Sequence, residues 1–100
     1  MEVKMQVEKL ETCLRAAIRV GHEVFIGRRH DEIILWMSAK LLTKYTWEEY
    51  MKLKKEQGFI TTNMRFVDRV EGLQLQLNAG IASVAPGGYR GNKLYSEDLY

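Results

Sequence analysis

The chain has 100 residues, of which 46% are hydrophobic and 28% are charged, and its formal net charge is +2. This is the composition of a globular domain, and it excludes a disordered or fibrous chain. The near balance of charge also excludes a protein that holds long DNA electrostatically, so any basic site must be local.

Two further features favour a soluble protein of the cytoplasm with no membrane association. No apolar run approaches the roughly 18 residues of a membrane span, and the first residues do not form the apolar block of a signal peptide. The single cysteine, Cys13, cannot form the internal disulfide that small secreted domains usually need.

The N-terminal part of the chain predicts antiparallel strands. Residues 2–8 alternate aliphatic and polar side chains, which is typical of a half-buried strand. Residues 10–20 fit either a helix or a strand. The pair Gly21-His22 lies between this run and the apolar residues 24–26, and a two-residue loop with glycine favours a hairpin that ends at Gly27.

Two helices are expected next. Apolar residues recur at helical spacing from about residue 32 to 43, and Asp31 is placed to cap this helix. Thr46 and Glu49 form a threonine-x-x-glutamate capping box. It predicts a second helix that runs to Gln57, with Gly58 as its C-terminal cap.

The rest of the chain predicts a short hairpin, a third helix and a loop. Residues 59–61 and 65–67 are β-type runs separated by residues 62–64, which indicates either a tight hairpin or one bent extended segment. Asp68 with Glu71 caps a helix that stops at Gly80. A glycine-rich loop over 85–92 precedes an acidic, aromatic tail over 94–100. We therefore expect one α+β domain over residues 1–100, an N-terminal β-hairpin followed by two or three helices with a short β-hairpin between them.

The inventory of reactive residues argues against an enzyme. Two histidines and one cysteine, well separated, give neither a nucleophile with its base nor the spacing of a zinc site. The glycine-rich loop lacks the pattern of a phosphate-binding P-loop. The prediction is therefore that the protein has no catalytic residue, no metal and no cofactor.

Two arginine clusters are candidate anion sites. Arg28, Arg29 and His30 lie where a strand is expected to end and a helix to begin, beside unpaired backbone N–H groups that favour anions. The alternative is a solvated turn whose arginines pair with the acidic residues 31 and 32.

The second cluster pairs arginines with aromatic rings. Arg65 and Arg69 flank the junction of an extended run and a helix, and Phe66 or Phe59 is available to stack on a base. The alternative assigns Phe66 to the core and Arg69 to a salt bridge with a neighbouring carboxylate. Trp36 and Trp47 are further candidates for the stacking ring.

Four segments in this order resemble a group of small phage proteins that includes the first type of Thoeris anti-defence sponges: G-R-R-H-D-E-I (27–33), Q-G-F-I-T (57–61), R-F-V-D-R (65–69) followed by Ala79-Gly80, and L-Y-S-E-D-L-Y (94–100). Met64 departs from the pattern, because a glycine often precedes the arginine there. The N-terminal strand region is also short.

The resemblance implies a protein that works in the cytoplasm of the infected bacterial host. It would sequester cyclic ADP-ribose isomers without cleaving them and so block Thoeris immunity. It also implies cyclic di- or trinucleotides, the signals of CBASS-type immunity, as a second ligand class, and a homo-oligomer, a dimer or hexamer, with pockets between protomers. Paired arginines four residues apart contact the nucleotide in such proteins, and Arg65 and Arg69 match that spacing.

Three functions remain open at the level of the sequence. The leading one is a non-catalytic sponge for a cyclic nucleotide. The alternative is a small phage inhibitor that binds a host protein directly through Tyr95, Tyr100 and the acidic pair Glu97-Asp98. A hydrolase of the same signals is disfavoured, because no general base or metal set is visible.

Overall fold

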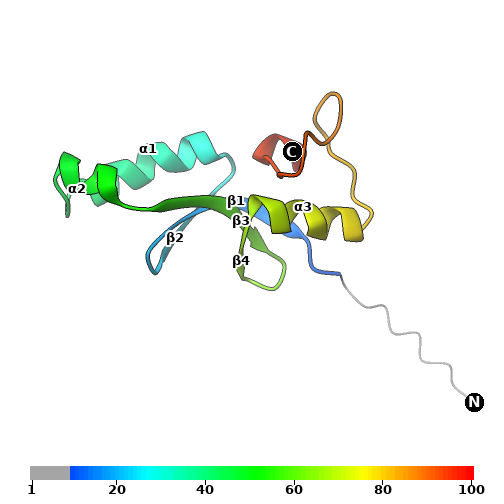
Figure 1. Cartoon of the computed structure of the whole chain (residues 1–100), viewed down its shortest axis with the longest axis horizontal. Coiled ribbons are helices and arrows are strands. Elements are labelled where there is room, and N and C mark those ends of the chain that lie inside the picture. Colours follow the sequence, from blue (N-terminus) through cyan, green and yellow to red (C-terminus); the bar gives the residue numbers. More distant parts are fainter. Residues whose placement is uncertain (1–9) are drawn as a thin grey trace, which may run out of the picture.

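Four antiparallel strands form one sheet in the order β2-β1-β3-β4 (Figure 1). The structure, a computed structural model, describes residues 10–100, so the strand predicted over residues 2–8 lies outside the described residues. The strands are β1 (Cys13–Val20), β2 (Glu23–Gly27), β3 (Lys55–Thr61) and β4 (Phe66–Asp68).

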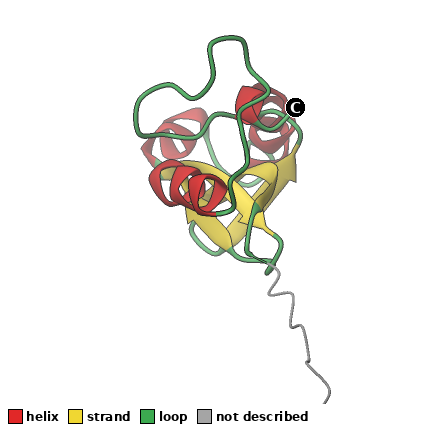
Figure 2. Ribbon diagram, turned by 90° about the vertical axis from the view of Figure 1, so that its right-hand side faces the viewer, coloured by secondary structure: helices red, strands yellow, loops and turns green. Residues whose placement is uncertain are grey.

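The helices gather on one side of this sheet (Figure 2). They are α1 (His30–Leu41), α2 (Trp47–Lys52), α3 (Arg69–Asn78) and a short 3₁₀ helix, η1 (Ser96–Asp98). The core lies between the helices and the sheet, where Phe59, Ile33 and Met37 have none of their surface exposed. The predicted α+β class is confirmed, with an N-terminal hairpin, helices and a second strand pair between them.

The first hairpin forms as predicted. Residues 10–20 contribute a strand, β1, and Gly21 adopts a left-handed conformation with φ of 60° at the turn. This conformation costs a glycine little, which explains why the chain reverses there. The strands then pair from Val20 with Glu23 to Ala16 with Gly27.

The first helix begins earlier than predicted, and Asp31 is not its cap. The N-cap is Arg29, whose side chain makes no capping hydrogen bond. Asp31 lies instead in the first turn, where a negative charge favours the positive end of the helix.

The second helix is shorter than predicted. The Thr46–Glu49 capping box is present, but α2 ends at Lys52, and Gly58 lies inside β3 instead of capping a helix. Residues 55–57 have helix-forming side chains, yet they pair with β1, and this long-range pairing outweighs local propensity. Gly58 is needed for packing, because a Cβ there would lie 2.0 Å from the carbonyl oxygen of Val67.

The hairpin of β3 with β4 and the third helix are confirmed. Met64 takes the left-handed position of the turn, with φ of 59°, a conformation that glycine adopts without strain. The carboxylate of Asp68 accepts a hydrogen bond from the backbone N–H of Glu71 at 2.8 Å and caps α3.

Candidate functional site

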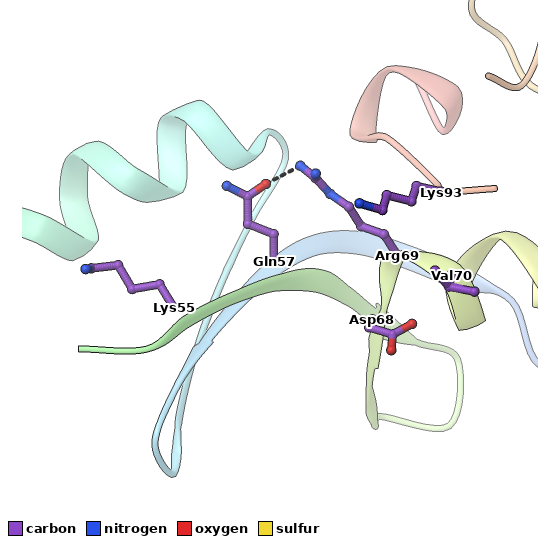
Figure 3. Close-up of a pocket in the computed structure, with 6 residues that line it drawn as sticks. All are labelled: Lys55, Gln57, Asp68, Arg69, Val70 and Lys93. Atoms are coloured by element: carbon purple, nitrogen blue, oxygen red, sulfur yellow. Dashed lines mark hydrogen bonds between the residues drawn. The ribbon is translucent and has the colours of Figure 1, made fainter. Parts of the chain in front are cut away.

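A cavity of about 430 Å³ opens beside the first turn of α3, on the helix-bearing side of the sheet (Figure 3). Strand β3, the β4–α3 junction and the segment before η1 supply its lining: Lys55, Gln57, Asp68, Arg69, Val70 and Lys93. Half of these side chains are cationic. The single carboxylate, that of Asp68, is already engaged as the cap of α3. The cavity therefore suits an anion.

Arg69 is the central residue of the cavity. Its Nη2 donates to Oε1 of Gln57 (Figure 3), and its guanidinium carbon lies 5.1 Å from the centroid of the Tyr95 ring. Its Nε is buried and has no hydrogen-bond partner among the described residues. A buried donor without a partner is costly, and a ligand oxygen would satisfy it.

The charge of Arg69 is also unpaired. None of the ion pairs found within residues 10–100 includes Arg69 or Lys93. Their side chains lie side by side in the cavity (Figure 3). Two cations without a counter-charge make an electropositive site that can attract phosphate groups.

Lys55 has a different role from the other two cations. Its ammonium donates to the carbonyl oxygens of Tyr50 at 2.8 Å and Leu53 at 3.2 Å. In Figure 3 it points away from Arg69, so Lys55 lines the cavity with its stem and caps the end of α2 with its charge.

The first predicted cluster lies at the β2–α1 corner. Arg29 donates to the backbone oxygen of Tyr100, and its Nη1 is buried without a partner in the described part of the chain. The guanidinium carbons of Arg28 and Arg29 lie 5.2 and 5.3 Å from the centroid of the Tyr100 ring. The alternative, in which these arginines pair with residues 31 and 32, is not found among the ion pairs of the described residues.

His30, the first residue of α1, is bonded to strand β3, which also lines the cavity. Its Nε2 lies 2.8 Å from the carbonyl oxygen of Gly58, so it carries the proton and donates. Burial lowers the pKa of His30, and the positive charge of Arg69 acts in the same direction. A neutral, buried histidine in contact with Phe59 is a packing residue and not an anion ligand.

The other predicted residues lie apart from the cavity. Arg65 donates to both carboxylate oxygens of Glu11, at 2.7 and 2.8 Å, and to Glu71 at 2.7 Å. The guanidinium carbon of Arg19 lies 4.7 Å from the ring centroid of Phe66. Phe59 is fully buried in the core. Their placement favours structural roles over contact with a ligand.

Of the residues that line the cavity, only Arg69 is predicted as a site residue from the sequence, and Gln57, Lys93 and the neighbouring Tyr95 are not. The sequence places Gln57 in a helix, and it gives Tyr95 a functional role only in the alternative of an inhibitor that binds a host protein. The structure instead ties the C-terminal segment to the fold: Leu94 is fully buried, and its N–H donates to the carbonyl oxygen of Arg69 at 2.9 Å. The one usable signal was the aromatic residue of L-Y-S-E-D-L-Y, as a partner for an arginine.

Within residues 10–100, no helix is long and apolar enough to cross a membrane. In the same part of the chain, no three side chains of His, Cys, Asp or Glu gather closely enough to hold a metal ion.

The fold and the cavity together define a small α+β protein with a local electropositive site. The chain belongs to the phage protein family described as Phage T4 y16D protein, whose model matches residues 12–100. No curated protein and no solved structure matches the chain. The family assignment thus establishes a phage protein, and the cavity is the starting point for its function.

Proposed function

We propose that this phage protein is a sponge: it binds a cyclic ADP-ribose-type signalling nucleotide in the Arg69 cavity and sequesters it without cleaving it. The observation that carries the proposal is the state of Arg69, a guanidinium with no ion pair in the described residues and with a buried Nε free to donate. A pyrophosphate supplies the oxygen acceptors and the negative charge that this group lacks. Bacterial Thoeris immunity would lose its signal by stoichiometric binding.

The chemistry of the cavity lining supports binding in preference to turnover. Its polar groups are amide, ammonium and guanidinium groups and one carboxylate that is bonded to the N–H of Glu71. Sequestration needs only a low dissociation constant, because no transition state has to be stabilised. Cyclic di- and trinucleotides carry phosphates as well, and they belong in the same binding panel.

The first test compares the two arginines of R-F-V-D-R. Replacing Arg69 by alanine removes charge-assisted hydrogen bonds of about 1.5 to 3 kcal/mol, which corresponds to roughly tenfold to hundredfold weaker binding. The matched control is Arg65→Ala, because Arg65 is bonded to Glu11 and Glu71 and not to the cavity. Isothermal titration with cyclic ADP-ribose isomers should show weak binding only for Arg69→Ala.

Recovery of the ligand decides between sponge and hydrolase. After the complex is denatured, the nucleotide should be chemically intact and present in an amount no greater than the protein sites. Consumption of many equivalents per protein would contradict the proposal, as would wild-type protein that binds none of the nucleotides in the panel.

A protein inhibitor of a host enzyme is the second candidate. The tail residues expected to carry it are engaged within the fold: Asp98 is 1% exposed, and Tyr95 and Tyr100 lie beside arginines. The surface that favours this candidate is instead on α1 and α2, where Leu35, Trp47 and Met51 are each more than half exposed. Co-purification of a host protein that is lost in a Leu35→Glu, Trp47→Glu variant would support it.

A further inference from the structure

One aromatic ring, that of Tyr95, contacts both the guanidinium of the cavity residue Arg69 and that of Arg90. The ring centroid of Tyr95 lies 5.1 Å from the guanidinium carbon of Arg69 and 4.9 Å from that of Arg90. These two distances place the guanidinium carbons no more than 10.0 Å apart. Arg90 belongs to no ion pair found in residues 10–100, so both charges are without a carboxylate. Two guanidiniums without a carboxylate within this range raise the local positive potential, which favours an anion that can contact both.

The backbone around Tyr95 is fixed on both sides. The N–H of Leu94 donates to the carbonyl oxygen of Arg69, and the N–H of Tyr95 donates to Oδ2 of Asp98 at 2.9 Å. Asp98 is itself buried and accepts a 2.6 Å hydrogen bond from Oγ of Ser83. The ring therefore presents a fixed surface to the guanidinium of Arg69, a side chain with several rotatable bonds.

Arg90 contacts the ring from a loop, whereas Arg69 is the first residue of a helix. Arg90 is exposed and lies in the glycine-rich loop, where Gly87, Gly88 and Gly91 all have positive φ angles. The ring contact is what places its charge near Arg69.

We infer that Tyr95 is a positioning residue that holds Arg69 and Arg90 as a pair, and that this pair selects ligands with two linked phosphates over ligands with one. The inference rests on the proposed binding function of the Arg69 cavity. A pyrophosphate is longer than a single phosphate, so it can contact both guanidiniums over more of the separation that the ring contacts allow.

The experiment titrates inorganic pyrophosphate and orthophosphate into the full chain and four variants at constant ionic strength. Tyr95→Leu removes the ring and should weaken pyrophosphate binding about threefold to tenfold, while Tyr95→Phe, which keeps the ring, should bind like wild type. Arg90→Ala, a change at an exposed residue, should weaken pyrophosphate binding by a similar factor and leave orthophosphate binding unchanged. The matched control is Tyr100→Leu, since Tyr100 lies beside Arg28 and Arg29 in the same manner.

A second readout needs no ligand. The ¹⁵N relaxation of the Arg69 Nε–H group should show a rigid side chain in wild type and in Tyr95→Phe, and a mobile one in Tyr95→Leu. Failure of wild type to bind either anion or any of the cyclic nucleotides would overturn the proposed function, and the relaxation data would still decide the role of Tyr95. An Arg69 side chain as rigid in Tyr95→Leu as in wild type would overturn the inference, as would equal loss of both anions in Arg90→Ala.

Discussion

Arg65 and Arg69 lie four residues apart in one short motif, but the structure gives these two cations very different partners. Arg65 contacts two carboxylates, whereas Arg69 contacts an amide and an aromatic ring and has no ion pair within residues 10–100. Four-residue spacing would bring two arginines together on a helix. Here β4 lies between them, and the chain turns into α3 only at Arg69. The partners of an arginine, and not its place in a motif, decide whether it can bind a ligand.

The Arg65 region has the features of a structural clamp. Glu11 comes from the segment before β1, Glu71 from the first turn of α3, and Thr61, which also donates to Glu11, from the end of β3. One guanidinium therefore ties three parts of the fold together. The Arg69 cavity has the opposite character: in the part of the chain that the structure describes, Arg69 and Lys93 have no ion pair, and the buried Nε of Arg69 has no acceptor. Such unsatisfied groups are tolerated where a ligand completes them.

The largest expected effect comes from Gly58→Ala, which should destroy both regions at once. The new Cβ would lie 2.0 Å from the carbonyl oxygen of Val67, so β4 would have to move away from β3. Overpacking against a backbone atom should cost about 3 kcal/mol or more in the free energy of unfolding. Thermal or urea unfolding measures it.

The control for this substitution is Gly72→Ala in α3. Its Cβ would approach side-chain atoms of Leu94 and Phe59 at 3.3 Å, a contact that small shifts can relieve. Alanine also favours a helix over glycine by about 1 kcal/mol. Gly72→Ala should therefore stay within about 1 kcal/mol of wild type. Equal stability of the two variants would contradict the role assigned to Gly58.

The sequence predicted those parts of the fold that depend on neighbouring residues. The turn at Gly21 and the caps at Thr46 and Asp68 are set by side chains within three or four positions of each other. Strand β3 was missed over residues 55–57, because its partner β1 lies more than thirty residues away. The predicted end of α2 at Gln57 was wrong for the same reason, since the helix ends at Lys52.

The residues of the candidate site divide in the same way, into those indicated by neighbouring residues and those brought in by long-range contacts. Arg69 was found from its place before a capped helix, and it lies in the cavity. Gln57 and Lys93 were not found, because they come from β3 and from the segment before η1. Arg65 is predicted together with Arg69 because both flank the same junction, whereas its actual partner, Glu11, is 54 residues away along the chain. Charge pairing of this kind is a property of the fold, so sequence spacing cannot reveal it.

The stability of the fold should depend on pH in two separate ranges, one set by the buried His30 and the other by Glu11, the partner of Arg65. His30 is buried and its pKa is lowered from an ordinary value of 6.5, so the unfolded chain binds a proton more readily than the folded one. The free energy of unfolding should therefore decrease as the pH falls below 6.5, because the folded state holds His30 in its neutral form. The pKa of Glu11 is lowered from 4.5, chiefly by its hydrogen bond to Arg65. That stabilisation should be complete above pH 4.5 and disappear as the pH falls further.

Thermal melts from pH 7.5 to 3 test both windows. His30→Gln should remove the loss of stability between pH 6.5 and 5, and Glu11→Gln should reduce the loss below pH 4.5, where Glu49 and Glu56 also contribute because their pKa values are lowered too. A wild-type melting temperature that is constant from pH 7.5 to 5 would rule out the buried, neutral state of His30.

The smallest expected effect concerns Lys93, the exposed cation beside Arg69. Its flexible, hydrated ammonium should contribute about 0.5 kcal/mol to anion binding, so Lys93→Ala should weaken pyrophosphate affinity by roughly a factor of two to three. Because exposed charges are screened by salt, the difference between variant and wild type should vanish between 0.05 and 0.5 M sodium chloride. The loss in Arg69→Ala should persist at high salt, since it removes hydrogen bonds from a partly buried group and not charge alone. Titration calorimetry at both salt concentrations distinguishes the cases: a salt-independent loss in Lys93→Ala would mean that Lys93 also bonds directly to the anion.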